Sequence, residues 1–599
     1  MQHHIDTSDL ERLSIQNLIN AYCIELKRFN IIRFNDQTSL HKQYSDGKDI
    51  LSLQLAPLQT VIMLPLNFAS VLGHHQIEGS IYVVKDNEVI KINTLMLVNL
   101  ILQDILYHHD RPQSLNIHDV LARWLNSYEK LQLILKNRQQ DIDCLFQKPT
   151  LDFVATEQAL IYGHAMHPAP KARIGFSDKD WQQFSPETQG SFQLSYWLID
   201  PQYYIEESDQ GELPSVKLMQ SVHNYLTEQQ KNLIQQHSTF KLLALHPWQA
   251  RHLQQKAFYQ SLLAQKSLFD FGQLGEPYAA TTSVRTVASS ALSMMLKLSL
   301  SVSITNSVRI NLPKECRRGL YASKIWHSEL GQRIRANYPH FDVINDPAWM
   351  GLVIDGEIVN ESIAIVRHYP FQNSDNVSNL ATLCQDHPYD GCNRFSYLFQ
   401  NIAQQSQATL NQIATTWFKD FLDISLSPMI DIYHRYGMVF EAHQQNSVLQ
   451  FKNHRPYKFW VRDNQSFGYV IDYAQTLIEQ YPELHEQAHC VVPTDFANSR
   501  FIYYFIGNTV FSLISAIAKT QYATEDELIE ILAKEMNHCL QKYPQSELLN
   551  SLASDDVLCY KGNLLTRLYQ LDELIAPVET QSIYVEIHNP MKKYIHSEA

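Results

Sequence analysis

A short stretch of alternating residue types carries the densest group of side chains able to bind an anion. Over residues 296–305, apolar residues alternate with one lysine and four hydroxyl residues, a period typical of a β-strand with one packed and one open face. Residues 281–320 hold six Lys or Arg and one acid, in a chain of net charge −14. We therefore expect a site for a polyanionic ligand here. Its cationic and hydroxyl side chains are Ser283, Arg285, Thr286, Lys297 and Arg309.

A straight strand would keep Lys297 and Arg309 apart. Twelve residues of extended chain span roughly 40 Å, which is too far for both to contact one small ligand. Residues 305–307 are of types that begin helices, and Pro313 is expected to end the element that they begin. We therefore expect a bend near Thr305 into a short helix, with Arg309 near its anion-favouring start. The alternative is a hydroxyl-rich strand on a solvated face.

A second cationic group lies in residues 162–176, where two histidines, a lysine and an arginine fall within ten residues. Pro168 and Pro170 restrict the backbone to extended or turn conformations. We expect a stiff loop that presents cationic groups, although a turn capped by its histidines is an equal alternative. A lone HxxH spacing without further ligands does not indicate zinc. The candidates are His167, Lys171 and Arg173.

Acid and amide side chains gather in residues 436–468. Glu441 and His443 alternate, so they share one face of a strand end, and Asn446 and Asp463 follow. Glu, Asn and Asp offer the hard oxygen ligands that suit Mg²⁺. An Asn followed by an Asp also holds Mg²⁺ on phosphates in kinase-type sites. The alternative is one buried histidine with capping Asx residues.

Two further cationic positions are less distinctive. Arg500 opens a helix expected over residues 501–518. Residues 560–567, YKGNLLTR, form a basic patch that on its own favours a solvated helix end.

The elements that must position these groups are those of a large mixed protein. A length of 599 residues corresponds to about four domain-sized units, and 45% hydrophobic with 18% charged residues indicates large cores. Helical periodicity over much of residues 1–35 and over residues 95–107 and 117–135, with strand patterns over 50–84, predicts a mixed α/β first part. Residues 470–599 favour helices.

The composition also restricts the cellular compartment and the kinds of binding partner that we expect. The acidic net charge argues against a nucleic-acid carrier. Eight scattered cysteines without a CxxC pair fit a reducing compartment. The N-terminal residues lack a secretory pattern, and we expect no uncharged apolar run of the roughly 18 residues that span a bilayer. A cytoplasmic protein without a membrane partner is expected.

Together these groups suit a nucleoside triphosphate plus a second anionic substrate. The segments GHAMHPAPKARIGF, HPWQ, TTSVRTV, LKLSLSVSITNSVR, FEAHQQN, the pair Arg462-Asp463 and KGNLLTRL follow one another as in the siderophore synthetases that work without a nonribosomal peptide template, the IucA/IucC family. The chain resembles that family over residues 150–570. The resemblance implies an α+β cupped-hand fold with a central antiparallel sheet flanked by helices. It implies a thumb section over residues 1–150, a fingers section over 151–380 and a mainly helical palm section over 381–599.

The resemblance also implies a reaction. Such enzymes use ATP and Mg²⁺ to adenylate a carboxylate, usually of citrate, and an amine or hydroxylamine then displaces AMP to form an amide. By resemblance, the ATP contacts are Ser283, Arg285, Thr286, Lys297 and Arg309, and the metal ligands are Glu441, Asn446 and Asp463. The catalytic residues are Lys297, Arg309 and His443. The substrate-carboxylate contacts are His167, Lys171, Arg173, Arg309, His443 and Arg500.

The family members differ in substrate and assembly. Some members use 2-oxoglutarate or a citrate monoamide. In this chain the sequence ITNSVR favours free citrate. Members of the family are often homodimers. Two other functions stay open: a kinase-like phosphotransferase, suggested by the Asn446 to Asp463 spacing, and a non-catalytic citrate- or siderophore-binding protein.

Overall fold

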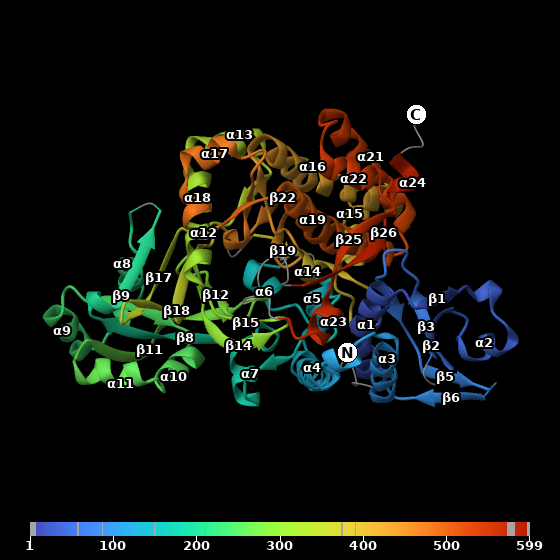
Figure 1. Cartoon of the computed structure of the whole chain (residues 1–599), viewed down its shortest axis with the longest axis horizontal. Helices are drawn as coiled ribbons and strands as arrows, with labels where there is room; N and C mark the ends of the chain where they lie inside the picture. The colour runs from blue at the N-terminus through green and yellow to red at the C-terminus, as the bar shows by residue number, and fades with distance from the viewer. Residues whose placement is uncertain are drawn as a thin grey trace.

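The computed structural model of this chain describes residues 7–56, 59–86, 88–148, 151–209, 211–372, 375–389, 391–571 and 582–595. Helices and largely antiparallel sheets occur along the whole chain, which confirms the expected α+β class. Figure 1 shows an elongated molecule with one sheet towards each end and the later helices above and between them.

The first part is a six-stranded antiparallel sheet covered by helices. Its strand order is β1-β2-β3-β5-β6, with β4 paired to β3. The strands predicted over residues 50–84 and the two later helices are confirmed, whereas the first helix is shorter than expected and a strand follows it. The elements are α1 (Thr7–Leu26), β1 (Phe29–Ile32), β2 (Asp49–Leu55), β3 (Thr60–Phe68), β4 (Gln76–Ile77), β5 (Ile81–Lys85), β6 (Glu88–Ile92), α3 (Thr94–His108) and α4 (Ile117–Arg138).

The largest sheet is antiparallel and has eight strands in the order β10-β8-β11-β12-β13-β18-β17-β9. Residues of α8, α10 and α11 join its apolar core. The strands are β8 (Ser191–Ile199), β9 (Tyr204–Ser208), β10 (Lys241–Leu245), β11 (Leu268–Ala280), β12 (Thr286–Ser289), β13 (Met294–Leu298), β17 (Ala348–Ile354) and β18 (Glu357–His368). The helices are α8 (Pro214–Val222), α10 (Pro247–Leu253) and α11 (Ala257–Ala264).

The alternating stretch is two strands that belong to different sheets. β13 lies inside the large sheet with every residue buried, whereas β14 (Leu300–Ile304) pairs with β15 (Ser307–Arg309) and with β7 (Arg173–Ile174) in a small sheet. The chain does bend at Thr305, which has φ +53°, but the bend is a β-hairpin turn. The expected short helix is therefore wrong: Arg309 lies on β15, opposite Leu300.

Pro313 also differs from its expected role. It stands at the first turn of α12 (Pro313–His327), where its missing N–H costs no intrahelical hydrogen bond. It therefore begins a helix rather than ending one.

The later part is mainly helical around the largest apolar core, as expected. A small sheet of order β16-β22-β21-β19 lies beside the long helix α16 (Leu410–Tyr436). Its strands are β16 (Phe341–Val343), β19 (Val377–Asn379), β21 (Ser447–Lys452) and β22 (Arg455–Val461).

One helical run, Thr494–Ala518, is long and apolar enough to cross a membrane, so the expectation that no segment could do so is wrong. Its apolar window is 100% buried inside the fold, as in the core helix of a soluble protein. It consists of α19 (Thr494–Arg500), a π-helix (Phe501–Val510) and α20 (Phe511–Ala518). π-helical segments are rare, and most occur as single-turn bulges inside α-helices, frequently at functional sites.

The C-terminal part returns to the first sheet. The last strand pair is β25 (Val557–Gly562) with β26 (Ile583–His588), and α23 (Asn563–Leu568) follows β25. Leu564 and Leu568 belong to the N-terminal core, and Glu25 accepts hydrogen bonds from the N–H groups of Leu564 and Leu565 at 2.9 and 2.8 Å. The basic patch at residues 560–567 is therefore buried, which contradicts the solvated helix end.

Candidate active site

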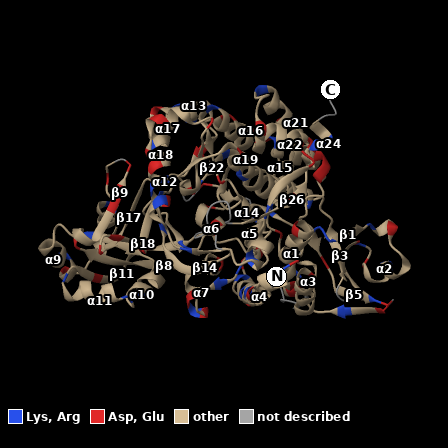
Figure 2. Ribbon diagram, in the orientation of Figure 1, with Lys and Arg blue, Asp and Glu red and all other residues tan. Residues whose placement is uncertain are grey.

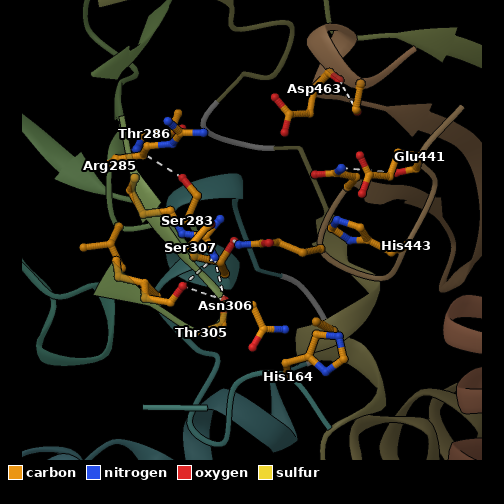
Figure 3. Close-up of a pocket in the computed structure, with 18 of the residues that line it drawn as sticks. His164, Ser283, Arg285, Thr286, Thr305, Asn306, Ser307, Glu441, His443 and Asp463 are labelled. Atoms are coloured by element: carbon orange, nitrogen blue, oxygen red, sulfur yellow. Dashed lines mark hydrogen bonds between the residues drawn. The ribbon is translucent and has the colours of Figure 1, made fainter. Parts of the chain in front are cut away.

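The hairpin, the large sheet and the π-helix surround a cavity of ≈ 360 Å³. All thirteen side chains singled out from the sequence line it. Its lining includes eleven Lys or Arg and four Asp or Glu, so an acidic chain encloses an electropositive cavity. Figure 2 shows part of this charge as blue ribbon at the lower end of α12. In Figure 3, Ser283, Arg285 and Thr286 face Glu441, His443 and Asp463 across the cavity.

The turn before β12 fixes the first hydroxyl and cationic residues. The Thr286 N–H donates to Ser283 Oγ at 3.1 Å, and Thr286 lies opposite Lys297 in the β12–β13 register. The Arg285 guanidinium donates to Asn311 Oδ1 at 2.9 Å and is 8% exposed. Burial, with Arg309 nearby, lowers the pKa of Arg285 to about 10, so it stays charged at neutral pH.

The buried Lys297 and the partly exposed Asp463 form an ion pair across the cavity, with the buried Arg367 as a third member. Arg367 donates to Asp463 at 2.8 Å and to both oxygens of Asp346 at 2.6 and 2.8 Å. Burial lowers the pKa of Lys297 to about 8, so the amine is mostly protonated at pH 7. Burial opposes ionisation of Asp463, yet Lys297 and Arg367 hold its pKa far below its usual range. An anionic ligand would compete with Asp463 for these cations.

A buried ion pair next to the Lys297–Asp463 pair connects the opposite walls of the cavity. Arg462 contacts Glu157, at the end of α6 (Phe153–Glu157), at 3.0 and 3.2 Å. Glu157 also accepts from the N–H and Oγ1 of Thr282 at 3.0 and 2.8 Å. The turn that carries Ser283 is thus tied to the residue that precedes Asp463.

Residues of the β14–β15 hairpin itself hold the side chain of Arg309 in place. Arg309 donates to the Ile304 carbonyl at 3.0 Å and to Thr305 Oγ1 at 2.6 Å. The His167 ring nitrogen Nε2 lies 3.2 Å from Asn306 Oδ1, so the 162–176 loop contacts the turn of the hairpin.

The 162–176 segment is a loop, as expected, but two of its cationic side chains already form ion pairs within the protein. Lys171 and Arg173 both contact Glu187, at 2.6 and 2.7 Å, and all three side chains are buried. Burial lowers the pKa of Lys171 to about 8. Despite its own burial, Glu187 has a pKa lowered to about 2 by Arg173 and Lys171. Glu187 balances one of the two positive charges, so the loop presents these cations as a paired cluster of net charge +1 rather than as two free charges.

The acid and amide group lies on the opposite wall. Asn446 donates from Nδ2 to the Glu441 carbonyl at 3.1 Å and lies in the turn after His443. Burial lowers the pKa of His443 against the effect of Glu441, so its imidazole is neutral at pH 7. The described residues contain no group of three or more His, Cys, Asp and Glu side chains that could hold a metal ion.

Several lining residues were not assigned roles from the sequence. The π-helix contributes Tyr503, Tyr504 and Asn508, and β25 contributes Lys561, which is 7% exposed. The sequence does offer a signal for Arg367. It is a charged residue inside the apolar strand sequence IAIVRHY, and a buried charge needs a partner. Arg500, which was assigned, stacks over Phe496 at 4.4 Å.

The fold and the cavity define an α+β protein with a cation-rich cavity, whose charge suits an anionic ligand. Two family models match the chain: the IucA / IucC family over residues 152–385, and the ferric iron reductase FhuF-like transporter over residues 415–576.

Relatives match most of the chain. The rhizobactin siderophore biosynthesis protein RhbC of Rhizobium meliloti is 31% identical over 536 residues, which cover 88% of this chain and 90% of that protein. The N(2)-citryl-N(6)-acetyl-N(6)-hydroxylysine synthase of Vibrio mimicus is 31% identical over 567 residues, covering 92% of each chain. The solved structure of ATP-bound aerobactin synthetase IucA from Klebsiella pneumoniae shares the fold, with a TM-score of 0.86, 24% identity, and coverage of 97% of this chain and 99% of that one.

This chain belongs to the IucA/IucC family of siderophore synthetases, as its motifs predicted. It is an enzyme of the ligase type.

Proposed function

We propose that this enzyme uses ATP to adenylate a carboxylate of citrate or a related polycarboxylate and then joins the acyl group to an amine or hydroxylamine. One observation carries the proposal: Arg285, Lys297 and Arg309 line the same cavity as Glu441, Asn446 and Asp463. The name of the Vibrio mimicus relative specifies a citryl product, and the Klebsiella structure is ATP-bound, which supports both substrates.

The cationic wall suits the triphosphate. Lys297, Arg285 and Arg309, with the hydroxyls of Ser283 and Thr286, would neutralise the phosphate oxygens while a carboxylate approaches the α-phosphorus. Lys297 is held beside that region by Asp463, so a phosphate could take over a cation that is already in position.

The wall that carries Glu441, Asn446 and Asp463 suits Mg²⁺, because these side chains offer oxygen ligands. Mg²⁺ is usually held by one or two carboxylates together with substrate phosphates, and Glu441 and Asp463, with the Asn446 amide, supply such a set. When bound, the ion would neutralise phosphate charge. The residues would need the nucleotide oxygens to complete the coordination, since they supply two carboxylates and one amide.

The second substrate would lie between the hairpin and His443. Arg309 and His167 face this region from the hairpin side, and Arg500 lines it from the start of the π-helix. Lys171 and Arg173 are paired with Glu187, so we propose that they shape the loop and contribute to the carboxylate site through its position.

The reaction divides into two balanced steps. A carboxylate oxygen forms a bond to the α-phosphorus, the bond to the β-phosphate breaks, and pyrophosphate leaves. The amine nitrogen then bonds to the acyl carbon, the acyl–oxygen bond to AMP breaks, and AMP leaves with the electron pair. Neutral His443 can take the proton that the nitrogen loses.

The test is carboxylate-dependent ATP–pyrophosphate exchange, which reports the first step without an amine. We expect exchange with citrate and weaker exchange with 2-oxoglutarate and succinate, and trapping by hydroxylamine should give the hydroxamate. Formation of ADP together with a phosphorylated acceptor would favour a phosphotransferase, and citrate binding without any ATP consumption would favour a binding protein.

We also propose that the enzyme acts in the cytoplasm as a homodimer. The scattered free cysteines support a reducing compartment. Sedimentation of the pure enzyme would test the assembly, since a monomer at micromolar concentration would contradict it.

A further inference from the structure

Arg367, on β18, is a buried cation of the cavity wall that none of the steps proposed above uses. Its side chain is 4% exposed and bridges two carboxylates. Nε and Nη2 donate to the two oxygens of Asp346 at 2.6 and 2.8 Å, and Nη2 also donates to Asp463 Oδ1 at 2.8 Å. A planar guanidinium with a forked pair of bonds to one carboxylate has a defined orientation. Arg367 therefore presents Nη2 to Asp463 from a fixed position.

The carboxylate at the other end of this fork is held by its surroundings. The Asp346 side chain is 1% exposed, and a Cβ added at Gly319 of α12 would lie only 3.1 Å from its own Cβ. The preceding residue, Asn345, accepts from Asn464 Nδ2 at 3.0 Å and from the His368 N–H at 2.9 Å. Hydrogen bonds therefore also join the residues that are next in sequence to Asp346, Arg367 and Asp463.

The two cations that contact Asp463 share one of its oxygens. Lys297 and Arg367 both donate to Oδ1, and no residue that the structure describes donates to Oδ2. The Asp463 side chain is 23% exposed and lines the cavity, so a ligand can reach it. Its backbone has φ +75°, a left-handed conformation that the surrounding structure must maintain. Asp463 is thus held through Oδ1, while Oδ2 is left for a ligand.

The charge of this cluster depends on where Lys297 points. In the free enzyme the cluster holds two cations and two carboxylates, so its net charge is zero: Lys297, Arg367, Asp346 and Asp463. Once Lys297 turns to a phosphate, one cation and two carboxylates remain, with a net charge of −1. A net negative charge beside an oxygen ligand attracts a divalent cation.

We propose that Arg367 is the positioning residue of the metal-binding carboxylate. It keeps Asp463 in place through Oδ1 when Lys297 turns to the nucleotide, and it leaves Oδ2 for the metal ion. The inference rests on the proposed function, in which Asp463 is one of the Mg²⁺ ligands. It implies that the metal ion and ATP bind cooperatively. The alternative is that Arg367 and Asp346 only stabilise the sheet.

Metal binding without turnover separates these two roles. Arg367→Lys keeps the charge but cannot form the fork to Asp346 while it contacts Asp463. Mn²⁺ replaces Mg²⁺, and citrate is omitted so that no adenylation occurs. By electron paramagnetic resonance, Arg367→Lys should raise the Kd of Mn²⁺ for the enzyme–ATP complex about tenfold, as the loss of an outer-shell partner does. Asp346→Asn, which weakens the fork from its other end, should raise the same Kd.

ATP binding without metal is the comparison that a merely structural role would fail. Calorimetry in EDTA should show that Arg367→Lys changes the Kd of ATP less than about twofold, because this residue acts on the metal ligand. Arg28→Lys is the matched control, since Arg28 pairs with the buried Asp104 and lies outside the cavity lining. It should leave both constants unchanged.

Pyrophosphate exchange gives an independent readout. The Mg²⁺ concentration for half the maximal rate should rise about tenfold in Arg367→Lys, and saturating Mg²⁺ should restore most of the rate. The coupling to Lys297 is tested without ATP. Lys297→Ala should then bind Mn²⁺ at least about fivefold more tightly than the wild type, because Asp463 keeps only one cation.

Thermal unfolding of each variant checks the fold. An unchanged Kd of Mn²⁺ in Arg367→Lys, an equal weakening of metal-free ATP, or a rate that Mg²⁺ does not restore would overturn the positioning role. A Lys297→Ala enzyme that binds Mn²⁺ no more tightly than the wild type would overturn the coupling. All these results leave wild-type exchange intact, whereas a wild-type enzyme without citrate-dependent exchange would overturn the proposed function.

Discussion

At the scale of single residues, Lys297 shows how the site is prepared for an anion. It is buried, and its charge is balanced by Asp463, which also pairs with Arg367; Arg367 pairs in turn with Asp346. Burying a lone cation is expensive, so the free enzyme needs this carboxylate. The same pairing gives the cation a position from which it can turn to a phosphate.

Replacing Lys297 tests its role directly. Lys297→Ala should lower the rate of pyrophosphate exchange about 100- to 1000-fold, because a positioned cation is lost from the phosphate site. The fold should persist, since Asp463 keeps Arg367 as a partner. Circular dichroism checks the fold, and exchange within threefold of the wild-type rate would refute the assignment.

The pH dependence of the reaction depends on the same side chain. Lys297 carries its charge below its pKa of about 8 and loses it as the pH rises through that value. The kcat/KM for ATP should therefore fall above about pH 8. Lys297→Arg stays charged, so in that variant the fall should move to higher pH. An unchanged descending limb would assign it to another group, such as Lys171.

At the scale of elements, local sequence predicted the strands but not their ends. The alternation over residues 296–305 correctly indicated extended chain, yet β13 is buried on both faces, because its residues contribute to the cores on either side of the central sheet. Only β14 shows the alternation in its burial. Residues 305–307 suit both helix starts and turns, so their types could not distinguish a helix from a hairpin.

Relieving the backbone strain at Thr305, in the hairpin turn, should lower activity without lowering stability. Thr305 has φ +53°, where a β-branched residue is strained, and its Oγ1 accepts from Arg309. Thr305→Gly should leave the apparent Tm unchanged or raise it, yet lower kcat/KM for the carboxylate about tenfold.

Asp355→Gly is the matched control, since Asp355 has φ +52° in a turn outside the cavity. It should leave activity unchanged. A Thr305→Gly enzyme with normal activity would show that the hairpin does not orient Arg309 for catalysis.

At the scale of the whole molecule, the site depends on pairs that are far apart in sequence. Glu157, Thr282 and Arg462 meet in one cluster, and α23 returns to the first sheet with Lys561 beside it. Family motifs could name many of these residues, but only the fold reveals that Glu187 pairs with two loop cations and that Arg367 pairs with Asp463. We propose residues 1–150, 151–380 and 381–599 as three sections, and the residues that line the cavity come from the second and third.

The buried pair that links two walls of the cavity should contribute to stability. Glu157→Gln removes the charge that balances Arg462, and the side chains are 0% and 4% exposed. We expect a loss of about 3 kcal/mol in the free energy of unfolding, because one buried charge loses its counter-ion. Urea unfolding measures this. A midpoint equal to that of the wild type would show that the link is not needed for stability.

The identity of the nucleotide product tests the proposed reaction most directly. The pure enzyme would be incubated with ATP, Mg²⁺, citrate and a primary amine, and the products would be identified by ³¹P NMR and mass spectrometry. We predict AMP and pyrophosphate in amounts equal to the citryl amide. Formation of ADP with a phosphorylated product would contradict adenylation.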